Sequence, residues 1–301
     1  MKPLAQLVTL ICFLLLGGQI ALANWQAFSL VNGNIIIDVE IEGQSVKAVL
    51  DSGATHHIIS NEFVENYGQE FKESKTVREV GIYGERELQD YRQVPIKLFG
   101  YDVTLKDVAT EQLDGFDLLL GGGFFSNVIV QIDYPNSRLR LLGKDAVDMK
   151  KHANVPMKRA RGSRLPAVQV EANGAKAWLI LDTGNAAGIL IKSSFVKDKG
   201  WLNVDSAVSR LDSKGVVDTS SVQSFRLNSL KIGPYDLENV LVATPSKDQI
   251  ADIGRYASES TLGTRIKSGV QAKGLIGYDI LKHFIVTIDY TAYKVNLYAP
   301  E

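Results

Sequence analysis

Two short segments of the chain combine a carboxylic acid, a hydroxyl group and a glycine in the same order. The first is Asp51-Ser52-Gly53 and the second is Asp182-Thr183-Gly184. Each follows three apolar residues, which predicts an aspartate at the end of a buried strand. A carboxylate there costs free energy unless it is hydrogen-bonded or functional. The hydroxyl can tie the loop into a local hydrogen-bond network, and glycine permits a tight turn with close backbone approach.

Two aspartates brought into contact would share one proton, because like charges at short distance do not both ionise readily. One carboxyl group then acts as a base that activates water. The other acts as an acid that polarises a carbonyl or protonates a leaving amine. Asp51 and Asp182 would therefore suffice for amide hydrolysis, and we expect no cofactor and no metal.

The two segments occupy equivalent places in an internal repeat of the chain. Val39-Glu40 before the first aspartate recurs as Val170-Glu171 before the second, and Ile132-Asp133-Tyr134 recurs as Ile288-Asp289-Tyr290. The order of the repeated pieces is kept along the chain, so coincidence is a poor explanation. A pseudo-twofold arrangement of the two copies would bring the two aspartates together.

Both copies are predicted to be mostly β. Residues 34–42 alternate apolar and polar side chains near their end, and the β-branched runs at 128–132 and 284–288 favour further strands. Helices are expected at residues 61–67, between a Ser60 cap and Gly68, and at residues 194–199. Many short strands with few helices indicate a mostly β protein.

Composition excludes some classes of protein. The 301 residues are enough for one or two domains, and 45% hydrophobic with 22% charged residues is ordinary globular usage. A formal net charge of -1 gives no support for a nucleic-acid partner. The one cysteine, Cys12, lies in the first apolar run, so a chain starting after that run would rely on its core without disulfides.

The N-terminus predicts a cleavable signal peptide over residues 1–23. Lys2 precedes a mostly apolar stretch over residues 4–16, and Ala21-Leu22-Ala23 fits an A-x-A cleavage site. An uncleaved anchor is the alternative, but the run is short for a span of about 20 residues and Gly17-Gly18 interrupts it. We expect a periplasmic or secreted protein with no stable membrane span after cleavage.

The motifs also resemble a known family. Asp51-Ser52-Gly53-Ala54-Thr55 and Asp182-Thr183-Gly184-Asn185, with the later turns Leu119-Leu120-Gly121 and Leu275-Ile276-Gly277, resemble aspartic peptidases of the pepsin-like and retropepsin-like superfamily, in a bacterial two-lobed form. The resemblance covers about residues 28–298. It implies a bilobal pepsin-like acid protease fold, with two homologous β-barrel-like lobes around an active-site cleft. The expected divisions are a lobe at 24–143, an interlobe connection at 144–164 and a lobe at 165–301.

The resemblance implies a role for each motif residue. Asp51 and Asp182 would hold the attacking water, and Ser52, Gly53, Thr183 and Gly184 would support the catalytic loops. Tyr83 and Gly84 look like the tip of a flap that closes over substrate, although Tyr83 would also suit an ordinary hairpin. The implied activity is that of an aspartic endopeptidase on peptides or unfolded proteins, for which a monomer suffices. A non-catalytic peptide-binding protein that keeps the fold is the alternative.

Three departures from the family pattern qualify these expectations. Ala54 stands where pepsin-like enzymes place a hydroxyl, which predicts a milder pH optimum because the carboxylate loses a donor. Asn185 either donates to Asp182 or points away from it. Gly122-Gly123 stands where the second copy has Tyr278-Asp279, which predicts looser support behind the first loop.

Other candidate features are weaker. His56-His57 is expected to serve packing or the surface rather than a metal, and Gly121-Gly122-Gly123 lacks the Lys-Ser/Thr of a phosphate loop. The basic residues between 150 and 164 are either solvated or contact an anionic envelope polymer. The second copy carries an insertion over about residues 245–273, which we expect to overhang the cleft.

Overall fold

A computed structural model of the chain describes residues 24–81, 84–163, 165–202, 209–214, 219–245 and 268–300. Three sequence predictions fall outside these ranges. They are the signal peptide at 1–23, Tyr83 at the flap tip, and residues 246–267 of the insertion. Among the described residues, no helix is long and apolar enough to cross a membrane.

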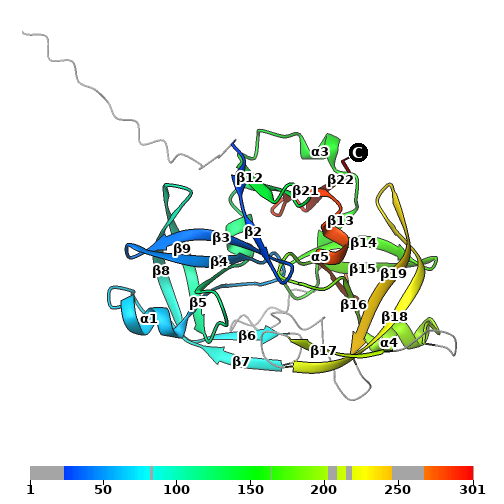
Figure 1. Cartoon of the computed structure of the whole chain (residues 1–301), viewed down its shortest axis with the longest axis horizontal. Coiled ribbons are helices and arrows are strands. Elements are labelled where there is room, and N and C mark those ends of the chain that lie inside the picture. The colour runs from blue at the N-terminus through cyan, green and yellow to red at the C-terminus, as the bar shows by residue number, and fades with distance from the viewer. Residues whose placement is uncertain are drawn as a thin grey trace, which may run out of the picture.

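The first lobe is a closed six-stranded barrel, and it lies on the left in Figure 1. The ring runs β3-β4-β10-β5-β9-β8 and closes because β3 also pairs with β8, while β2 adds to the edge. The strands are β2 (Ser29–Val31), β3 (Asn34–Ile41), β4 (Gln44–Leu50), β5 (His57–Ser60), β8 (Asp90–Leu98), β9 (Tyr101–Glu111) and β10 (Leu118–Leu120).

The second lobe repeats this barrel with the same order of strands. The ring runs β14-β15-β20-β16-β19-β18 and closes through pairing of β14 with β18, and β13 and β17 extend its edges. The strands are β13 (Met157–Arg159), β14 (Pro166–Ala172), β15 (Ala175–Leu181), β16 (Ile189–Ile191), β17 (Ser209–Lys214), β18 (Thr219–Ile232), β19 (Tyr235–Pro245) and β20 (Gly274–Ile276). The predicted fold class, mostly β with two barrel-like lobes in a bilobal pepsin-like fold, is confirmed.

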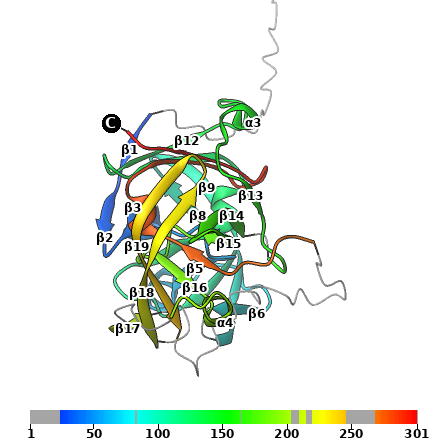
Figure 2. The same ribbon diagram turned by 90° about the vertical axis from the view of Figure 1, so that its right-hand side faces the viewer.

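A five-stranded antiparallel sheet joins the lobes, in the order β1-β12-β11-β21-β22. Its central pair is β11 from the first repeat and β21 from the second, with Ile132 opposite Val286. The strands are β1 (Gln26–Ala27), β11 (Ile129–Asp133), β12 (Arg138–Leu142), β21 (Ile285–Asp289) and β22 (Lys294–Tyr298). The two views place this sheet at one end of the molecule, above both barrels (Figures 1 and 2).

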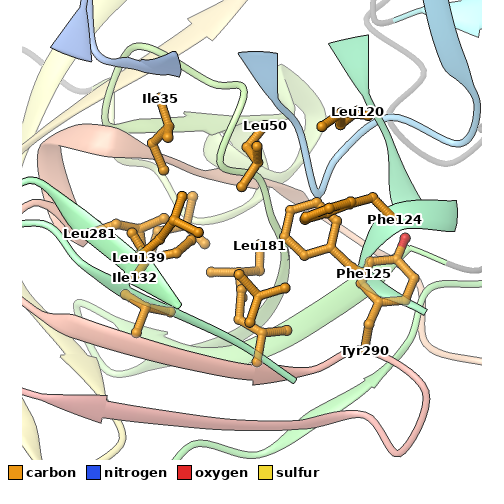
Figure 3. Close-up of a cluster of buried hydrophobic side chains, with 14 of the residues drawn as sticks. Ile35, Leu50, Leu120, Phe124, Phe125, Ile132, Leu139, Leu181, Leu281 and Tyr290 are labelled. Carbon is orange, nitrogen blue, oxygen red and sulfur yellow. The ribbon is translucent and has the colours of Figure 1, made fainter. Parts of the chain in front are cut away.

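The core is shared between the two repeats. Its largest cluster takes residues from both barrels and from the joining sheet. Leu50 and Leu181, the residues before the two aspartates, both lie in this cluster (Figure 3). Burial of this shared apolar cluster therefore also stabilises the arrangement in which the ends of β4 and β15 meet.

The β3–β4 hairpin turn of the first barrel and the β14–β15 hairpin turn of the second have the same backbone conformation. Glu42 and Gly43 both have positive φ, at 48° and 74°, and Asn173 and Gly174 have 43° and 78°. Two consecutive residues with positive φ make the two-residue hairpin turn whose twist suits antiparallel strands. This turn fixes the register of β4 and β15, and with it the place where each aspartate emerges.

The helices are short, as the sequence predicts. They are α1 (Asn61–Tyr67), α2 (Gly122–Phe125), α3 (Met149–His152), α4 (Ser193–Asp198) and α5 (Tyr278–Leu281). The α1 prediction is confirmed with its cap, since the Ser60 hydroxyl accepts from Phe63 N at 3.1 Å and Gly68 ends the helix. The predicted helix at 194–199 is present but lies one residue earlier, at Ser193–Asp198.

The predicted connection between the lobes contains structure of its own. Asp148 caps α3 by accepting from Lys150 N and Lys151 N, and β13 pairs with β14 in the second barrel's sheet. Lys150, Lys151 and Lys158 are all exposed, and Lys158 also lies over the Trp178 ring at 5.6 Å.

We expect Ser60→Ala to lower the free energy of unfolding by about 1 kcal/mol, because α1 loses its only side-chain cap. Ser60→Thr keeps the acceptor and should retain most of that stability. Urea unfolding of the three proteins measures the difference. Equal midpoints for wild type and Ser60→Ala would show that the cap contributes nothing.

Candidate active site

The two aspartates stand at equivalent ends of parallel strand pairs. In the first lobe, Leu50 pairs with Leu120 and Asp51 N donates to Leu120 O at 3.0 Å. In the second, Leu181 pairs with Ile276 and Asp182 N donates to Ile276 O at 3.0 Å. The apolar-apolar-Gly segments therefore pass beside the strands that deliver the aspartates, as the resemblance implies.

Ser52 and Thr183 tie the two loops together through four reciprocal hydrogen bonds. Ser52 N donates to Thr183 Oγ1 at 2.9 Å, and Thr183 N donates to Ser52 Oγ at 3.0 Å. The hydroxyls reach across to the opposite strand, where Ser52 Oγ donates to Leu181 O and Thr183 Oγ1 to Leu50 O, both at 2.8 Å. Both residues are buried. Each hydroxyl thus donates once and accepts once without contact with water.

Gly53 and Gly184 bring the two carboxyl groups against each other. Within each loop the glycine N–H donates to the aspartate two residues before it, at 2.8 Å for Asp51 Oδ1 and 3.0 Å for Asp182 Oδ1. A methyl group on Gly53 would collide with the carboxyl group of Asp182, and one on Gly184 would collide with that of Asp51. Each glycine therefore lies against the carboxyl group from the other lobe. The Asp51 and Asp182 side chains are hydrogen-bonded to each other.

Asp182 holds a proton far more readily than an exposed aspartate. Burial raises its pKa well above the ordinary value, and the charge of Asp51 and the hydrogen bond to Asp51 raise it further. The N–H groups of Gly184 and Asn185 oppose this shift, and the raising causes prevail. A carboxyl pair in contact that retains one proton supplies an acid and a base at the same pH.

The structure decides between the alternatives for Asn185. Its Nδ2 donates to Gly188 O at 3.2 Å, and its Oδ1 accepts from Ala187 N at 3.1 Å. The side chain therefore closes its own loop and points away from the Asp182 carboxyl. Ala54 supplies a different contact, since its carbonyl oxygen accepts from Gly122 N at 2.9 Å and its methyl group packs with Ile58 and Leu119.

The prediction of looser support behind the first loop is wrong, because two side chains fill the room that the glycines leave. A methyl group on Gly122 would lie 2.6 Å from the Tyr290 hydroxyl oxygen, and one on Gly123 would lie 2.7 Å from His57 Nε2. Tyr290 stacks on Phe125 at 5.9 Å between ring centroids (Figure 3). The first loop is thus supported by the rings of Tyr290 and His57, which come from other elements. In the second lobe, Tyr278 stands at the position equivalent to Gly122 and supplies the ring itself.

His57 has the packing role that the sequence favours. It is buried, and its Nδ1 has no hydrogen-bond partner among the described residues. Burial, with a smaller contribution from the charge of His56, lowers the pKa of His57 from 6.5 to about 4. Within the part of the chain that the structure describes, no three His, Cys, Asp or Glu side chains are grouped so as to hold a metal ion.

The predicted flap region forms a hairpin. Strands β6 (Val77–Gly81) and β7 (Gly84–Leu88) pair antiparallel with Gly81 opposite Gly84, so residues 82 and 83 connect them. Gly84 therefore begins β7, while Tyr83 lies outside the described residues. The second lobe has a corresponding hairpin, with Lys214 of β17 opposite Thr219 of β18. Both hairpins lie at the end of the molecule opposite the joining sheet (Figures 1 and 2).

Sequence reasoning assigned no role to two tyrosines that lie behind the loops. Tyr134 and Tyr290 are both buried, and both end the repeated Ile-Asp-Tyr segment. The repeat itself was the available indication, because residues duplicated together with the aspartates are candidates for a shared task. Burial then distinguishes them from ordinary strand tyrosines, which commonly keep the hydroxyl in water.

Two family models match the chain in tandem, one on each lobe. The family described as "gag-polyprotein putative aspartyl protease" matches residues 37–127, and the family described as "Aspartyl protease" matches residues 168–280. The chain therefore belongs to the aspartyl protease families, as a two-lobed, retropepsin-like aspartic peptidase. The matches support aspartic protease function in general, which is a hydrolase activity on peptides. A search of curated proteins finds no match to the chain.

We expect Thr183→Val to lower the free energy of unfolding by roughly 2 to 4 kcal/mol, because it removes two buried bonds and leaves Ser52 N and Leu50 O unpaired. Thr183→Ser keeps the hydroxyl and should lose far less. Combined with Ser52→Ala in a double-mutant cycle, Thr183→Val should be clearly non-additive. Additive losses in chemical denaturation would mean that the two hydroxyls do not act as one network.

His57 should make the protein lose stability in acid. The pKa of His57 is lower in the folded than in the unfolded protein. The neutral side chain therefore makes its full contribution to the free energy of unfolding above pH 6.5, and this contribution is lost as the pH falls toward 4. The loss amounts to about 3 kcal/mol, at 1.36 kcal/mol per unit of pKa. Denaturant unfolding of wild type and His57→Leu at several pH values measures it. Parallel stability curves for the two proteins would contradict this assignment.

Proposed function

We propose that this protein is an aspartic endopeptidase that hydrolyses peptide bonds with a water activated between Asp51 and Asp182. The observation that carries the proposal is the contact of two carboxyl groups, the buried Asp182 and the half-buried Asp51, held by symmetric loops. Burying the Asp182 carboxyl group in contact with a second carboxyl group is costly for a fold that needs only a binding surface. Acid-base chemistry gives a reason for that cost.

The reaction follows from one proton shared by two carboxyl groups. The ionised carboxyl takes a proton from the water as the water oxygen attacks the peptide carbonyl carbon. The protonated carboxyl donates to the carbonyl oxygen, which gives a neutral tetrahedral intermediate. Proton transfer to the amine nitrogen then lets the C–N bond break. The raised pKa of Asp182 supports this scheme, and the milder pH optimum expected from Ala54 is proposed with it.

The substrate class is a peptide or an unfolded protein lying extended between the lobes. Strand-like hydrogen bonds from the surrounding β structure would hold its backbone. Tyr83 and Gly84 are proposed to close over it, in keeping with the β6–β7 hairpin. Since one chain carries both aspartates, a monomer would suffice for activity.

The cellular setting is part of the proposal as well. The signal-like residues 1–23 favour a periplasmic or secreted enzyme of bacterial origin. The divisions at 24–143, 144–164 and 165–301 are proposed as the lobes and their connection. The joining sheet nevertheless draws strands from both lobes.

The function is tested by hydrolysis of an unfolded protein with wild type, Asp51→Asn and Asp182→Asn. Loss of the acid-base pair should lower the rate by roughly 10²-fold or more in each variant. Asp145→Asn, at an exposed position, serves as the matched control and should retain the wild-type rate. Equal turnover by all four proteins would end the assignment. Peptide binding without turnover by any of them would favour the non-catalytic binding protein.

A further inference from the structure

Tyr134 occupies an unusual position behind the loop of the second lobe. It follows β11 in the joining sheet and is 3% exposed. Its ring packs edge-on against Phe28 at 6.2 Å and tilted against Tyr278 at 6.0 Å. Its hydroxyl is buried and has no hydrogen-bond partner among the described residues. A buried hydroxyl without a partner is costly, so its retention calls for an explanation.

Tyr278 connects Tyr134 to the loop that carries Asp182. Tyr278 N donates to Asn185 O at 2.9 Å, and Asn185 N donates to Asp182 O at 3.3 Å. The first lobe also contacts Tyr278 through the β2–β3 turn, where a methyl group on Gly33 would lie 3.0 Å from Tyr278 Cδ1 and 2.7 Å from Ala186 O. Residues of the first repeat therefore support the catalytic loop of the second.

Tyr290 is the counterpart of Tyr134 under the first loop, and its surroundings differ. Where Tyr134 meets the Tyr278 ring, Tyr290 meets Gly122, which is also close to the Ala54 carbonyl. The two repeats therefore present the same residue type to the two loops in different ways. Tyr290 offers a matched position at which the effect of a hydroxyl can be compared.

We propose that Tyr134 is a positioning residue for Asp182. Its ring holds Tyr278 and the loop over residues 182–188, and its hydroxyl brings a dipole into the desolvated surroundings of the Asp182 carboxyl. This inference rests on the proposed function in one respect, since it takes Asp182 as half of the catalytic pair. It extends that function by naming a residue of the first repeat that positions the catalytic aspartate of the second lobe.

The charge of Asp182 also acts on the Tyr134 hydroxyl. Burial first, then the charge of Asp182, then Tyr278, raise the pKa of Tyr134 far above its ordinary value. Tyr134 thus stays protonated and acts as a dipole rather than a charge. The titratable groups that act on this pair are Asp51 on the opposite loop and Tyr278 on α5. An O–H dipole favours a nearby carboxylate more than an apolar C–H does, so removing it should raise the pKa of Asp182 further.

The direct test is Tyr134→Phe, which keeps the ring and removes only the hydroxyl. We expect the alkaline limb of the kcat profile against pH to move up by roughly half a unit, with KM nearly unchanged. The titration of Asp182, followed by ¹³C NMR of the labelled carboxyl group, should move in the same direction. Tyr134→Leu, which also removes support for Tyr278, should lower kcat by at least about tenfold.

Tyr290→Phe is the matched control and should leave the Asp182 titration at its wild-type position. Should Tyr134→Phe leave that titration unmoved, or should Tyr290→Phe move it equally, the inference is overturned. If Tyr134→Phe fails to fold, wild-type protein with ¹³Cζ-labelled tyrosine replaces it. The Tyr134 signal must then follow the ionisation of Asp182, and a flat response refutes the proposal. The NMR readouts need no turnover, so a protein without peptidase activity would refute the proposed function and still test this inference.

Discussion

The structure depends on holding two carboxyl groups in contact, which their mutual repulsion and the burial of Asp182 both oppose. The reciprocal bonds of Ser52 and Thr183 meet this constraint, because each hydroxyl bonds both the backbone N–H of the other and the strand that precedes it. Neither lobe can move its loop without breaking bonds in both. The shared core beneath, which contains both Leu50 and Leu181, supports the same junction from the apolar side.

The two halves keep the same barrel, and they have diverged behind the loops. In the second lobe Tyr278, at the start of α5, lies behind the Asp182 loop and is supported from the first repeat by Tyr134 and Gly33. In the first lobe, Gly122 and Gly123 leave room that Tyr290 and His57 fill. An asymmetric support gives two chemically identical carboxyl groups different surroundings, which is what one acid and one base require. The buried neutral His57 adds a sensitivity to strong acid that accords with a milder working pH.

Much of this arrangement could be predicted from the sequence, because its main determinants are local. Duplicated Asp-Ser/Thr-Gly segments behind apolar strands indicate the pair, and alternation and turn glycines indicate the barrels. The support behind the loops could not be predicted in the same way. It depends on which ring reaches a given glycine from a distant strand, as Tyr290 reaches Gly122. Composition at Gly122-Gly123 suggested looseness, and long-range packing reversed that expectation. The direction of the Asn185 side chain depends likewise on loop geometry rather than on residue type.

The most direct measurement is a high-resolution crystal structure of the protein at mildly acidic pH, with the carboxyl oxygens of Asp51 and Asp182 located individually. The account predicts that the nearest oxygens of the two groups lie within hydrogen-bond distance, about 2.5–3.0 Å, with one proton between them. Carboxyl groups that turn away from each other, too far apart to share a proton or a water, would contradict it.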